Sequence, residues 1–379
     1  MKKTLTTASV SLVLLCSLTP AALQAQAPQA ADRAKEVAHI KAFWTKDRIA
    51  AAQPRDFVLD HRGLAYIKGT GARPIPYGHS TPAQPEPLAK GGKGGGGGRP
   101  GGGGDTGGTG TDFQDVSNAQ WTNGGVVQRA AGRIYFVMDG GRGYVCSGTL
   151  INDGEVTSSR SVVLTAAHCV YDDVNKAFAE SAIFIPNQAA TTGAGTDADC
   201  ANDPDGCWVA DFGVVSVDWT AAIFPDNIPS DYGYYALGTD NPSNTYWNNE
   251  GNSVPADRVI PPMDVSFGQA TLGLYTRALG YSYSDDPNFM YCGEPVMGSS
   301  YDGYLLPNCG MSGGASGGPW SQSDALDLGV GPIMSVNSYG PSRGRKYMGG
   351  PRLYNNDATC LFARVQNAAS GNTTGLVGC

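Results

Sequence analysis

The stretch Ser161-Val162-Val163-Leu164-Thr165-Ala166-Ala167-His168-Cys169 is the starting point for the fold. Its apolar, β-branched beginning is typical of a buried β-strand, and a histidine follows that strand at once. His168 is the single histidine after position 110, since His39, His61 and His79 all lie nearer the N-terminus. A lone histidine is more often packed or solvated than catalytic, so His168 indicates chemistry only together with a second motif.

The second motif surrounds one serine with small residues: Gly313-Gly314-Ala315-Ser316-Gly317-Gly318-Pro319. Such a run is either a flexible loop or a tight turn that exposes the hydroxyl and directs backbone N–H groups at a reacting atom. In the second case Gly314 turns its N–H inward without a Cβ clash. Together with the N–H of Ser316 it then forms an oxyanion hole.

Three motifs, taken in order, resemble those of the trypsin/chymotrypsin-like serine endopeptidases. They are Cys146-Ser147-Gly148-Thr149-Leu150-Ile151, Thr165-Ala166-Ala167-His168-Cys169 and Gly314-Ala315-Ser316-Gly317-Gly318-Pro319. The segment from Cys309 to Trp320 is more similar to the secreted microbial branch that includes glutamyl endopeptidases. The resemblance, over residues 120–379, implies an all-β fold of two antiparallel six-stranded β-barrels with the active site between them.

The spacing of β-rich segments agrees with this fold class. Asp139-Gly140-Gly141 predicts a hairpin between the first two segments, and long helical patterns are scarce in residues 112–379. Short strands separated by turn clusters are typical of a barrel or sandwich. The expected strands cover residues 133–138, 144–151, 161–165, 182–185, 212–217, 234–237, 271–279 and 333–336.

The resemblance also implies roles for individual residues. Ser316 is the expected nucleophile, His168 the expected general base, and an aspartate is expected to orient the imidazole. Asp231 is the preferred aspartate because it precedes a strand-like run that ends in Leu237, and Asp211 is the alternative. No metal or cofactor is implied. The residues expected to contact substrate are Gly310, Met311, Ser312, Ser338, Tyr339 and Gly340.

Departures from the family narrow these expectations. Ala315 stands where trypsin and chymotrypsin have an aspartate that pairs with a new N-terminus, so that activation switch is missing. Gly310 stands where trypsin has the aspartate that reads Arg or Lys. Asn337 stands where glutamyl endopeptidases use a histidine, which argues against glutamyl specificity. A medium-sized or apolar substrate side chain is therefore expected, while an acidic preference stays open because of three nearby basic residues, Arg343, Arg345 and Lys346.

The charge distribution separates a basic front from an acidic body. Residues 1–110 hold 14 Lys/Arg and 7 Asp/Glu, whereas residues 111–379 hold 12 and 27, and the whole chain has a net charge of -8. An acidic body excludes a nucleic-acid binder that relies on a basic surface. Protein or peptide substrates are the expected partners of a monomer, with no nucleic-acid or membrane partner.

The N-terminal residues predict export. Residues 1–27 have the pattern of a signal peptide, with Lys2 and Lys3, the short apolar run Ala8–Leu18, and a small-residue cleavage site at Ala25-Gln26-Ala27. The apolar run is too short for a membrane anchor. The mature chain is therefore expected outside the cytoplasm, in the extracellular space or the periplasm.

The cysteines agree with export. Eight remain after residue 27, and an even number in an exported chain indicates disulfides rather than zinc ligands. Pairing in sequence order gives Cys146–Cys169, Cys200–Cys207, Cys292–Cys309 and Cys360–Cys379, and the resemblance supports the first pair. Four aspartates around the second pair fit either a solvated loop, which is preferred, or a calcium site; they are Asp197, Asp199, Asp203 and Asp205.

Residues 28–90 are expected to form a separate front segment, joined to the body by a flexible linker at residues 91–111 that is rich in glycine. Ala31–Ala52 predicts one amphipathic helix that ends before Pro54, and residues 57–59 and 64–67 predict two strands. We interpret the front segment as a propeptide that assists folding or masks the cleft. A permanent accessory module is the alternative.

The whole pattern predicts a secreted serine endopeptidase, made as a zymogen, whose catalytic domain spans residues 112–379. Another class of function is a protease-like fold retained as a catalytically silent binding module. That class usually lacks the nucleophile or the base, and both are present here. A structural or adhesive surface protein is a third reading, suggested by the glycine-rich stretch.

Overall fold

The computed structural model describes residues 26–68, 75–77, 113–154, 161–193, 200–237, 255–323, 331–367 and 375–379. The predicted signal peptide up to residue 25, the predicted linker at 91–111, and Asp197 and Asp199 lie outside the described residues.

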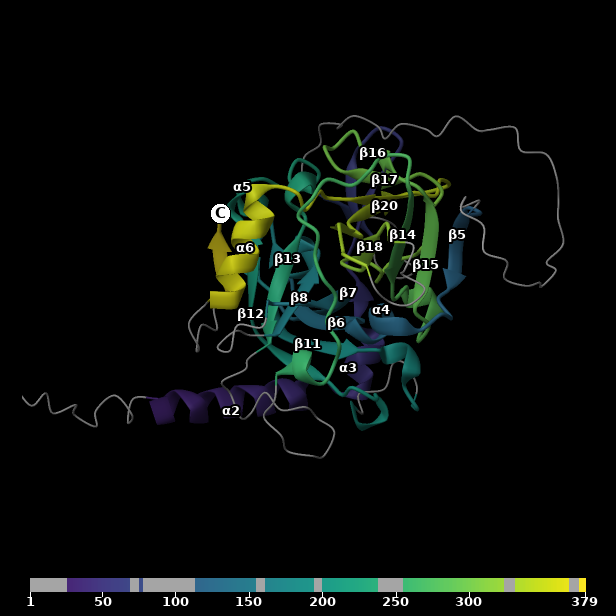
Figure 1. Ribbon diagram of the computed structural model, residues 1–379. Helices are drawn as coiled ribbons and strands as arrows, with labels where there is room; N and C mark the ends of the chain where they lie inside the picture. The colour runs from purple at the N-terminus through teal and green to yellow at the C-terminus, as the bar shows by residue number, and fades with distance from the viewer. Residues whose placement is uncertain are drawn as a thin grey trace, which may run out of the picture.

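The first half of the body is a closed six-stranded antiparallel barrel (Figure 1). The strands pair in the order β7-β6-β11-β12-β13-β8, and β8 closes the barrel by pairing with β7. The predicted hairpin is present, since β6 and β7 pair along their length. At its turn, Asp139 and Gly140 have positive φ values, of 52° and 73°. The bounds are β6 (Ala131–Met138), β7 (Arg142–Ile151), β8 (Ser161–Thr165), β11 (Glu180–Pro186), β12 (Trp208–Ser216) and β13 (Gly233–Leu237).

The second half of the body contains two further sheets, which lie beside the first barrel (Figure 1). One sheet has the order β19-β18-β14-β15-β5, and the other begins β16-β17-β21-β20. The all-β prediction is thereby confirmed. The bounds are β5 (Val116–Gln120), β14 (Tyr275–Gly280), β15 (Met290–Pro295), β16 (Met297–Gly298), β17 (Tyr304–Leu306), β18 (Pro319–Ser321), β19 (Ser335–Val336), β20 (Tyr339–Pro341) and β21 (Met348–Gly350).

A C-terminal helix, α6 (Asn356–Asn367), packs on the outside of the first barrel and was not predicted. Asn355 begins it, because the side-chain oxygen of Asn355 accepts the N–H of Ala358 at 2.7 Å. Ala358, Leu361 and Val365 form its buried face. The final strand, β22 (Leu376–Gly378), runs parallel to β12.

The prediction of disulfides is confirmed, and the four bonds join the pairs expected from sequence order. Cys146–Cys169 links β7 to the residue after His168, and Cys360–Cys379 links α6 to the last residue of the chain. The others are Cys200–Cys207 and Cys292–Cys309.

The front segment begins with two helices, so the prediction of a single helix is wrong. They are α2 (Gln26–Phe43) and α3 (Lys46–Ala51). Trp44 is buried between them and its indole N–H donates to the carbonyl oxygen of Ser181 at 2.6 Å, which holds the chain against the barrel at the break. Thr45 then starts the second helix by accepting the N–H of Arg48.

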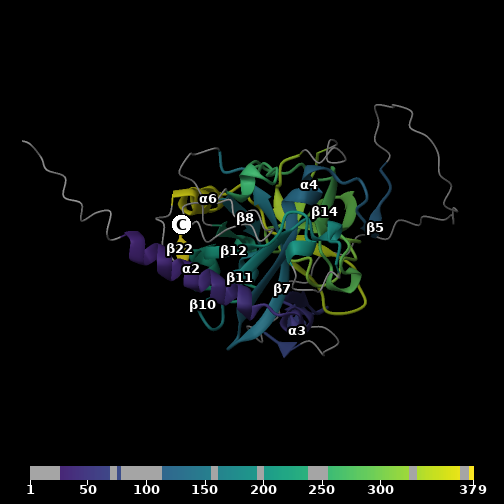
Figure 2. The same ribbon diagram turned by 90° about the horizontal axis from the view of Figure 1, so that it is seen from below.

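These helices lie along the outside of the first barrel (Figures 1 and 2). Their apolar side chains form one buried cluster with the outward-facing side chains of the barrel strands. The cluster includes Val37, Ile40, Trp44 and Ile49 from the front, and Tyr135, Val137, Val145, Ile183, Ile185 and Val209 from the barrel. The predicted apolar face of Val37, Ile40 and Trp44 is therefore buried against the body.

The strands of the front segment join the sheets of the body. β1 (Gln53–Pro54) runs parallel to β7, and β2 (Asp56–Leu59) runs parallel to β20. The sheet continues through β3 (Ala65–Lys68) and β4 (Ile75–Pro76). The two strands predicted at 57–59 and 64–67 thus correspond to β2 and β3. They are built into the body rather than folded apart from it.

The remaining elements are short. They are α4 (Gly125–Ala130), α5 (Val217–Ala221), β9 (Tyr171–Asp172), β10 (Ala177–Phe178), and the 3-10 turns η1 (Ala167–Cys169), η2 (Gln188–Ala190), η3 (Cys200–Asn202), η4 (Ile228–Ser230), η5 (Ala256–Arg258) and η6 (Tyr283–Asp285).

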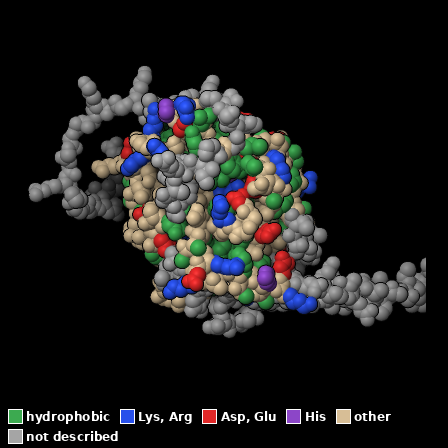
Figure 3. Space-filling view, turned by 180° about the vertical axis from the view of Figure 1, so that it is seen from behind, with side chains coloured by type: hydrophobic (Ala, Val, Ile, Leu, Met, Phe, Trp, Pro, Cys, Tyr) green, Lys and Arg blue, Asp and Glu red, His purple; other side chains and the backbone are tan. Residues whose placement is uncertain are grey.

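Among the described helices, none combines the length and the apolar composition needed to cross a bilayer. On the face seen in Figure 3, the acidic and basic side chains of the described residues are interspersed rather than gathered by sign.

Candidate active site

The barrel topology brings His168 and Asp231 together. His168 lies in η1, directly after β8, and Asp231 lies directly before β13. β8 and β13 are antiparallel neighbours, with Thr165 opposite Gly233. Residues that follow one strand and precede the other must therefore lie at the same edge of the barrel.

Asp231 is held by three hydrogen bonds in a fully buried position. Its Oδ1 accepts the backbone N–H of His168 at 2.9 Å, and its Oδ2 is 2.8 Å from Nδ1 of the same imidazole. The hydroxyl of Ser338 donates to Oδ2 at 2.5 Å. With Nδ1 donating to the carboxylate, Nε2 carries the lone pair of a neutral imidazole.

The alternative aspartate does not take this position. Asp211 lies within β12 and is partly exposed. Within the described part of the chain, both carboxylate contacts of His168 come from Asp231. Within the described residues, Nε2 of His168 is buried and has no hydrogen-bond partner, so the Ser316 hydroxyl does not bond to it in this state.

The loop that carries Ser316 is fastened to the first barrel. The carbonyl oxygen of Ser316 accepts the N–H of Ser147 at 2.7 Å. Gly317 has a φ of +83°, and a Cβ there would lie 2.1 Å from Oγ1 of Thr165. The turn after the serine therefore requires glycine, and it sets the serine against the strands that precede His168.

Asn337 holds the same loop from the other side. Its Nδ2 donates to the carbonyl oxygens of Leu279 and Ala315, both at 2.8 Å, and its Oδ1 accepts the indole N–H of Trp320 at 2.7 Å. All polar atoms of this side chain are thus engaged within the body. Asn337 supports the serine loop instead of facing the cleft.

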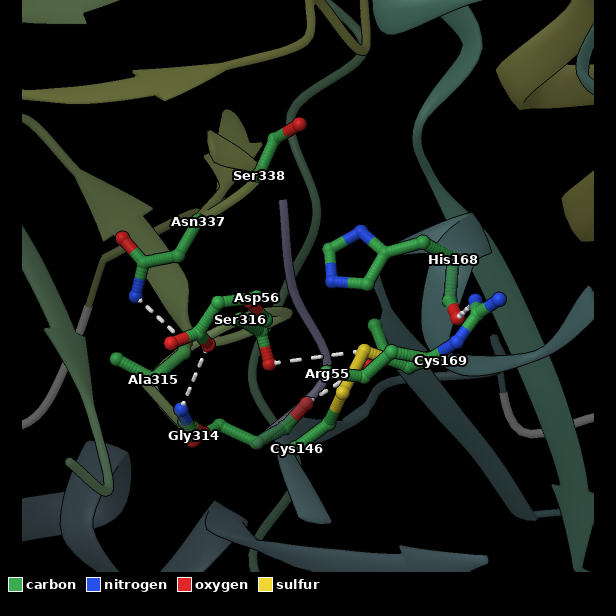
Figure 4. Close-up of a disulfide and its surroundings, with 12 residues drawn as sticks. Arg55, Asp56, Cys146, His168, Cys169, Gly314, Ala315, Ser316, Asn337 and Ser338 are labelled. Atoms are coloured by element: carbon green, nitrogen blue, oxygen red, sulfur yellow. Dashed lines mark hydrogen bonds between the residues drawn. A yellow bond between two sulfur atoms is a disulfide. The ribbon is translucent and has the colours of Figure 1, made fainter. Parts of the chain in front are cut away.

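Gly314 has the inward-turned conformation expected of an oxyanion-hole residue, with a φ of +91°. Its N–H donates to a side-chain oxygen, Oδ1 of Asp56, at 3.1 Å (Figure 4). Its own carbonyl oxygen accepts the hydroxyl of Ser147 at 2.9 Å, which fixes the orientation of the peptide.

A cleft opens beside Ser316, and most of the predicted substrate-contacting residues line it. Gly310 is different, because its N–H donates to the carbonyl oxygen of Ser117 at 2.7 Å and its Cα faces Ser117 and Lys346. The described lining of the cleft consists of Met311, Ser312, Gly313, Ser316, Ser338, Tyr339, Gly340, Pro341 and Met348 from the body, with Asp56, Phe57 and Val58 from the front segment.

Sequence reasoning missed three front-segment residues that reach this site. Besides Asp56, the fully buried Arg55 donates to the carbonyl oxygen of His168 at 2.7 Å. The ring of Phe57 stacks on the imidazole of His168, with 4.7 Å between the ring centroids. Phe57 was expected to be in a strand, but no local pattern indicates a partner more than a hundred positions away.

Arg55 lies beside a group of carboxylates that includes Asp172 and Asp139. Its guanidinium is 3.6 Å from Oδ2 of Asp172. Burial raises the pKa of Asp172, but the hydrogen bond with Asp139, the charge of Arg55 and the donors of Asn175 outweigh it and bring that pKa to about 2. Burial, followed by the hydrogen bond with Asp172, raises the pKa of Asp139. Of the two carboxyls, Asp172 therefore holds its negative charge to lower pH, and its carboxylate faces Arg55.

The candidate metal positions offer no free ligand set among the described residues. Clusters of ligating side chains occur at Cys146, His168 and Cys169 and at Cys200, Asp203 and Cys207. All four cysteines are in disulfides, so no thiolate is available. Asp203 and Asp205 are both buried, so these aspartates are not solvated as expected, and Asp205 forms an ion pair with Arg129 at 2.9 Å.

Comparisons with known proteins agree with this architecture. The family model of the lysyl endopeptidase C-terminal domain matches residues 104–248, a stretch that includes His168 and Asp231 but ends before Ser316. A comparison with curated protein sequences gives no match.

Solved structures give the fold. Protease Anisep from Arthrobacter nicotinovorans is 24% identical, with a TM-score of 0.52, and the match covers 66% of this chain and 100% of that one. The thermostable serine protease AL20 from an extremophilic microorganism is also 24% identical, with a TM-score of 0.51, over 64% of this chain and 100% of its own. The chymotrypsin-like fold and the resemblance expected from the motifs are confirmed.

Proposed function

We propose that residues 112–379 are a serine endopeptidase in which Ser316, His168 and Asp231 act as nucleophile, general base and orienting acid. The observation that carries the proposal is the buried chain of hydrogen bonds from Ser338 through Asp231 to Nδ1 of His168. With Nδ1 bound to the carboxylate, Nε2 is the nitrogen that can accept a proton. The family match and the two homologous protease folds support a peptidase.

In the proposed reaction, Oγ of Ser316 attacks the carbonyl carbon of the scissile peptide while its proton passes to Nε2 of His168. The C–N bond then breaks, the proton moves from Nε2 to the departing amine, and an ester to Ser316 remains. Water repeats the sequence: its proton goes to Nε2, its oxygen attacks the ester, and the proton returns to Oγ as the acid product leaves.

The charge that develops on the carbonyl oxygen needs fixed donors. Gly314 supplies one, because its peptide is oriented by the bond from Ser147 and its N–H points at an acceptor in the cleft. We assign the second to the N–H of Ser316. Donors that are already in place before the reaction stabilise the oxyanion without reorganisation. Each such donor lowers the activation free energy by about 3 kcal/mol.

The lining of the cleft supports an uncharged substrate side chain. Met311 and Met348 contribute apolar surface, and Asp56 is the acidic side chain among the described lining residues. Asp56 belongs to the front segment, so the described lining residues of the body offer no carboxylate to read a lysine. We therefore do not extend the lysine preference in the name of the matching family to this chain.

The remaining sequence features support production as an exported precursor. Four disulfides fit an oxidising compartment. Asp56, Phe57 and Val58 of the front segment line the cleft, and its two helices pack on the barrel, as is expected of a propeptide. We propose that the segment is removed in the mature enzyme.

Phenylmethylsulfonyl fluoride tests the proposal directly. Attack by Oγ on sulfur forms a sulfonyl ester and releases fluoride, so the protein gains one adduct that peptide mapping locates. We expect the adduct on Ser316, and casein hydrolysis that disappears both with the adduct and in Ser316→Ala. Ser266→Ala is the matched control, because Ser266 lies outside the described lining of the cleft. Labelling spread over several serines would contradict the proposal.

A catalytically silent binding module is the second candidate. It is favoured by the state of the intact chain, in which Nε2 of His168 has no partner within the described residues and Phe57 stacks on the ring. It predicts no hydrolysis and no adduct even after the front segment has been removed by added protease.

A further inference from the structure

The front segment places a side-chain carboxylate where the proposed reaction develops negative charge. Oδ1 of Asp56 accepts the N–H of Gly314 at 3.1 Å, and a Cβ built on Gly313 would lie 1.7 Å from Oδ2 (Figure 4). The carboxylate thus lies directly against the Gly313–Gly314 peptide. A carboxylate oxygen and the oxyanion of a tetrahedral intermediate are both negative acceptors, and they satisfy the same donor.

The neighbours of Asp56 cover the other half of the site. Phe57 is buried, stacks on the His168 ring and lies 4.4 Å from the ring of Phe224. Burial of this aromatic ring stabilises the contact of the segment with the site. Arg55 fastens the segment to the carbonyl oxygen of His168 and to Asp172. Consecutive residues therefore contact the proposed base and the proposed oxyanion donor together.

The segment is also held by its backbone. Residues Phe57, Val58 and Leu59 pair in parallel with Tyr339, Gly340 and Pro341 of β20. Tyr339 and Gly340 of this strand were expected to contact substrate. The segment thus takes up both the strand edge and the oxyanion donor of the same cleft.

We propose that Asp56 is an internal inhibitory residue: its carboxylate occupies the oxyanion hole and makes the front segment a ligand of the active site that cannot be cleaved there. The inference rests on the proposed function. A side-chain carboxylate has no amine leaving group, and its charge disfavours attack by a nucleophile. It fills the donor site without entering the reaction, whereas a peptide carbonyl in that place would be hydrolysed.

The test measures how fast phenylmethylsulfonyl fluoride modifies Ser316 in the intact chain and compares wild type with variants of the front segment. Mass spectrometry verifies that residues 28–379 remain joined. Asp56→Ala should react about 10- to 100-fold faster than wild type, the size expected from losing a hydrogen bond to a charged group. Asp47→Asn is the matched control, since Asp47 is an exposed acid of the same segment in α3. It should react at the wild-type rate.

Asp56→Asn keeps the shape of the side chain and removes its charge. It replaces Asp56→Ala in the test if the alanine variant does not fold. It should react faster than wild type, and both variants are checked by circular dichroism. Equal rates in wild type, Asp56→Ala and Asp56→Asn would overturn the inhibitory role while leaving the proposed function standing. A processed N-terminus at Phe57 would also overturn it, because Asp56 would then be a cleaved residue. No adduct in any variant, and none after added protease has removed the front segment, would refute the proposed function itself.

Discussion

Arg55 donates a hydrogen bond to the backbone carbonyl oxygen of His168, which lies 113 positions further along the chain. The guanidinium is fully buried and also faces the ionised Asp172. A residue of the front segment therefore supports the backbone of the proposed base. The front segment and the active site are parts of one structure in the intact chain.

Arg55→Ala should destabilise the intact chain by about 3–5 kcal/mol, because it leaves a buried carboxylate without its cation. Chemical denaturation followed by circular dichroism measures this change. Arg62→Ala provides the comparison, since Arg62 forms an exposed ion pair with Asp60 and should shift the midpoint much less. Equal shifts in the two variants would show that the Arg55 contacts are not formed in solution.

Asp231→Asn should reduce kcat of the processed enzyme by about four orders of magnitude, because the amide no longer fixes the required imidazole tautomer. The fold should persist, since the amide occupies the same space. Asp211→Asn is the control and should retain nearly full activity, as Asp211 lies within β12. A large loss in Asp211→Asn with little in Asp231→Asn would reverse the assignment. Steady-state kinetics on a peptide ester distinguishes the two results.

Asn337→Asp should cost more stability than Asn337→Ala. The Nδ2 donor serves two carbonyl oxygens, those of Leu279 and Ala315. An aspartate would place an acceptor against both, and each unsatisfied buried group costs about 1–3 kcal/mol. Because Ala315 precedes the nucleophile, both variants should also lose activity. Thermal unfolding measures the order of stability of wild type and the two variants. If Asn337→Asp were as stable as wild type, the hydrogen bonds assigned to Asn337 would be wrong.

Acidification should weaken the anchor of the front segment. The pKa of Asp172 is lowered to about 2 in the folded chain, so its ion pair with Arg55 contributes stability above the unfolded pKa of about 3.9. That contribution is lost as the pH falls through about 2. The difference in thermal midpoint between wild type and Asp172→Asn should therefore be constant from pH 7 to 5 and shrink toward pH 2. A difference that grows on acidification would refute this assignment.

The body could be predicted well because its signals are local. The apolar run before His168 and the Asp139-Gly140 turn each specify a strand or hairpin within a few residues, and β8 and the β6–β7 hairpin appear where expected. Asp231 was chosen because it precedes a strand-like run, and the antiparallel pairing of β13 with β8 brings it beside His168. Helix α6 had a readable signal that was not used: a capping asparagine at 355 followed by buried positions at 358, 361 and 365.

The position of the front segment could not be predicted in this way. β2 pairs with a strand about 280 positions away, and nothing in the residues of either strand specifies a parallel register with the other. The break at Trp44 has the same cause, since its partner is the carbonyl oxygen of Ser181 on β11. Tertiary contacts of this kind override the helical periodicity that predicts one continuous helix over Ala31–Ala52.

The apolar cluster shared by the two helices of the front and the outer face of the barrel has a kinetic consequence. Cutting the chain between front and body breaks one covalent bond and leaves those buried contacts intact. The clipped polypeptide would still hold its leader, and hydrolysis would start only after the leader dissociates. Activation should then show a lag that follows dissociation and dilution rather than the cut itself.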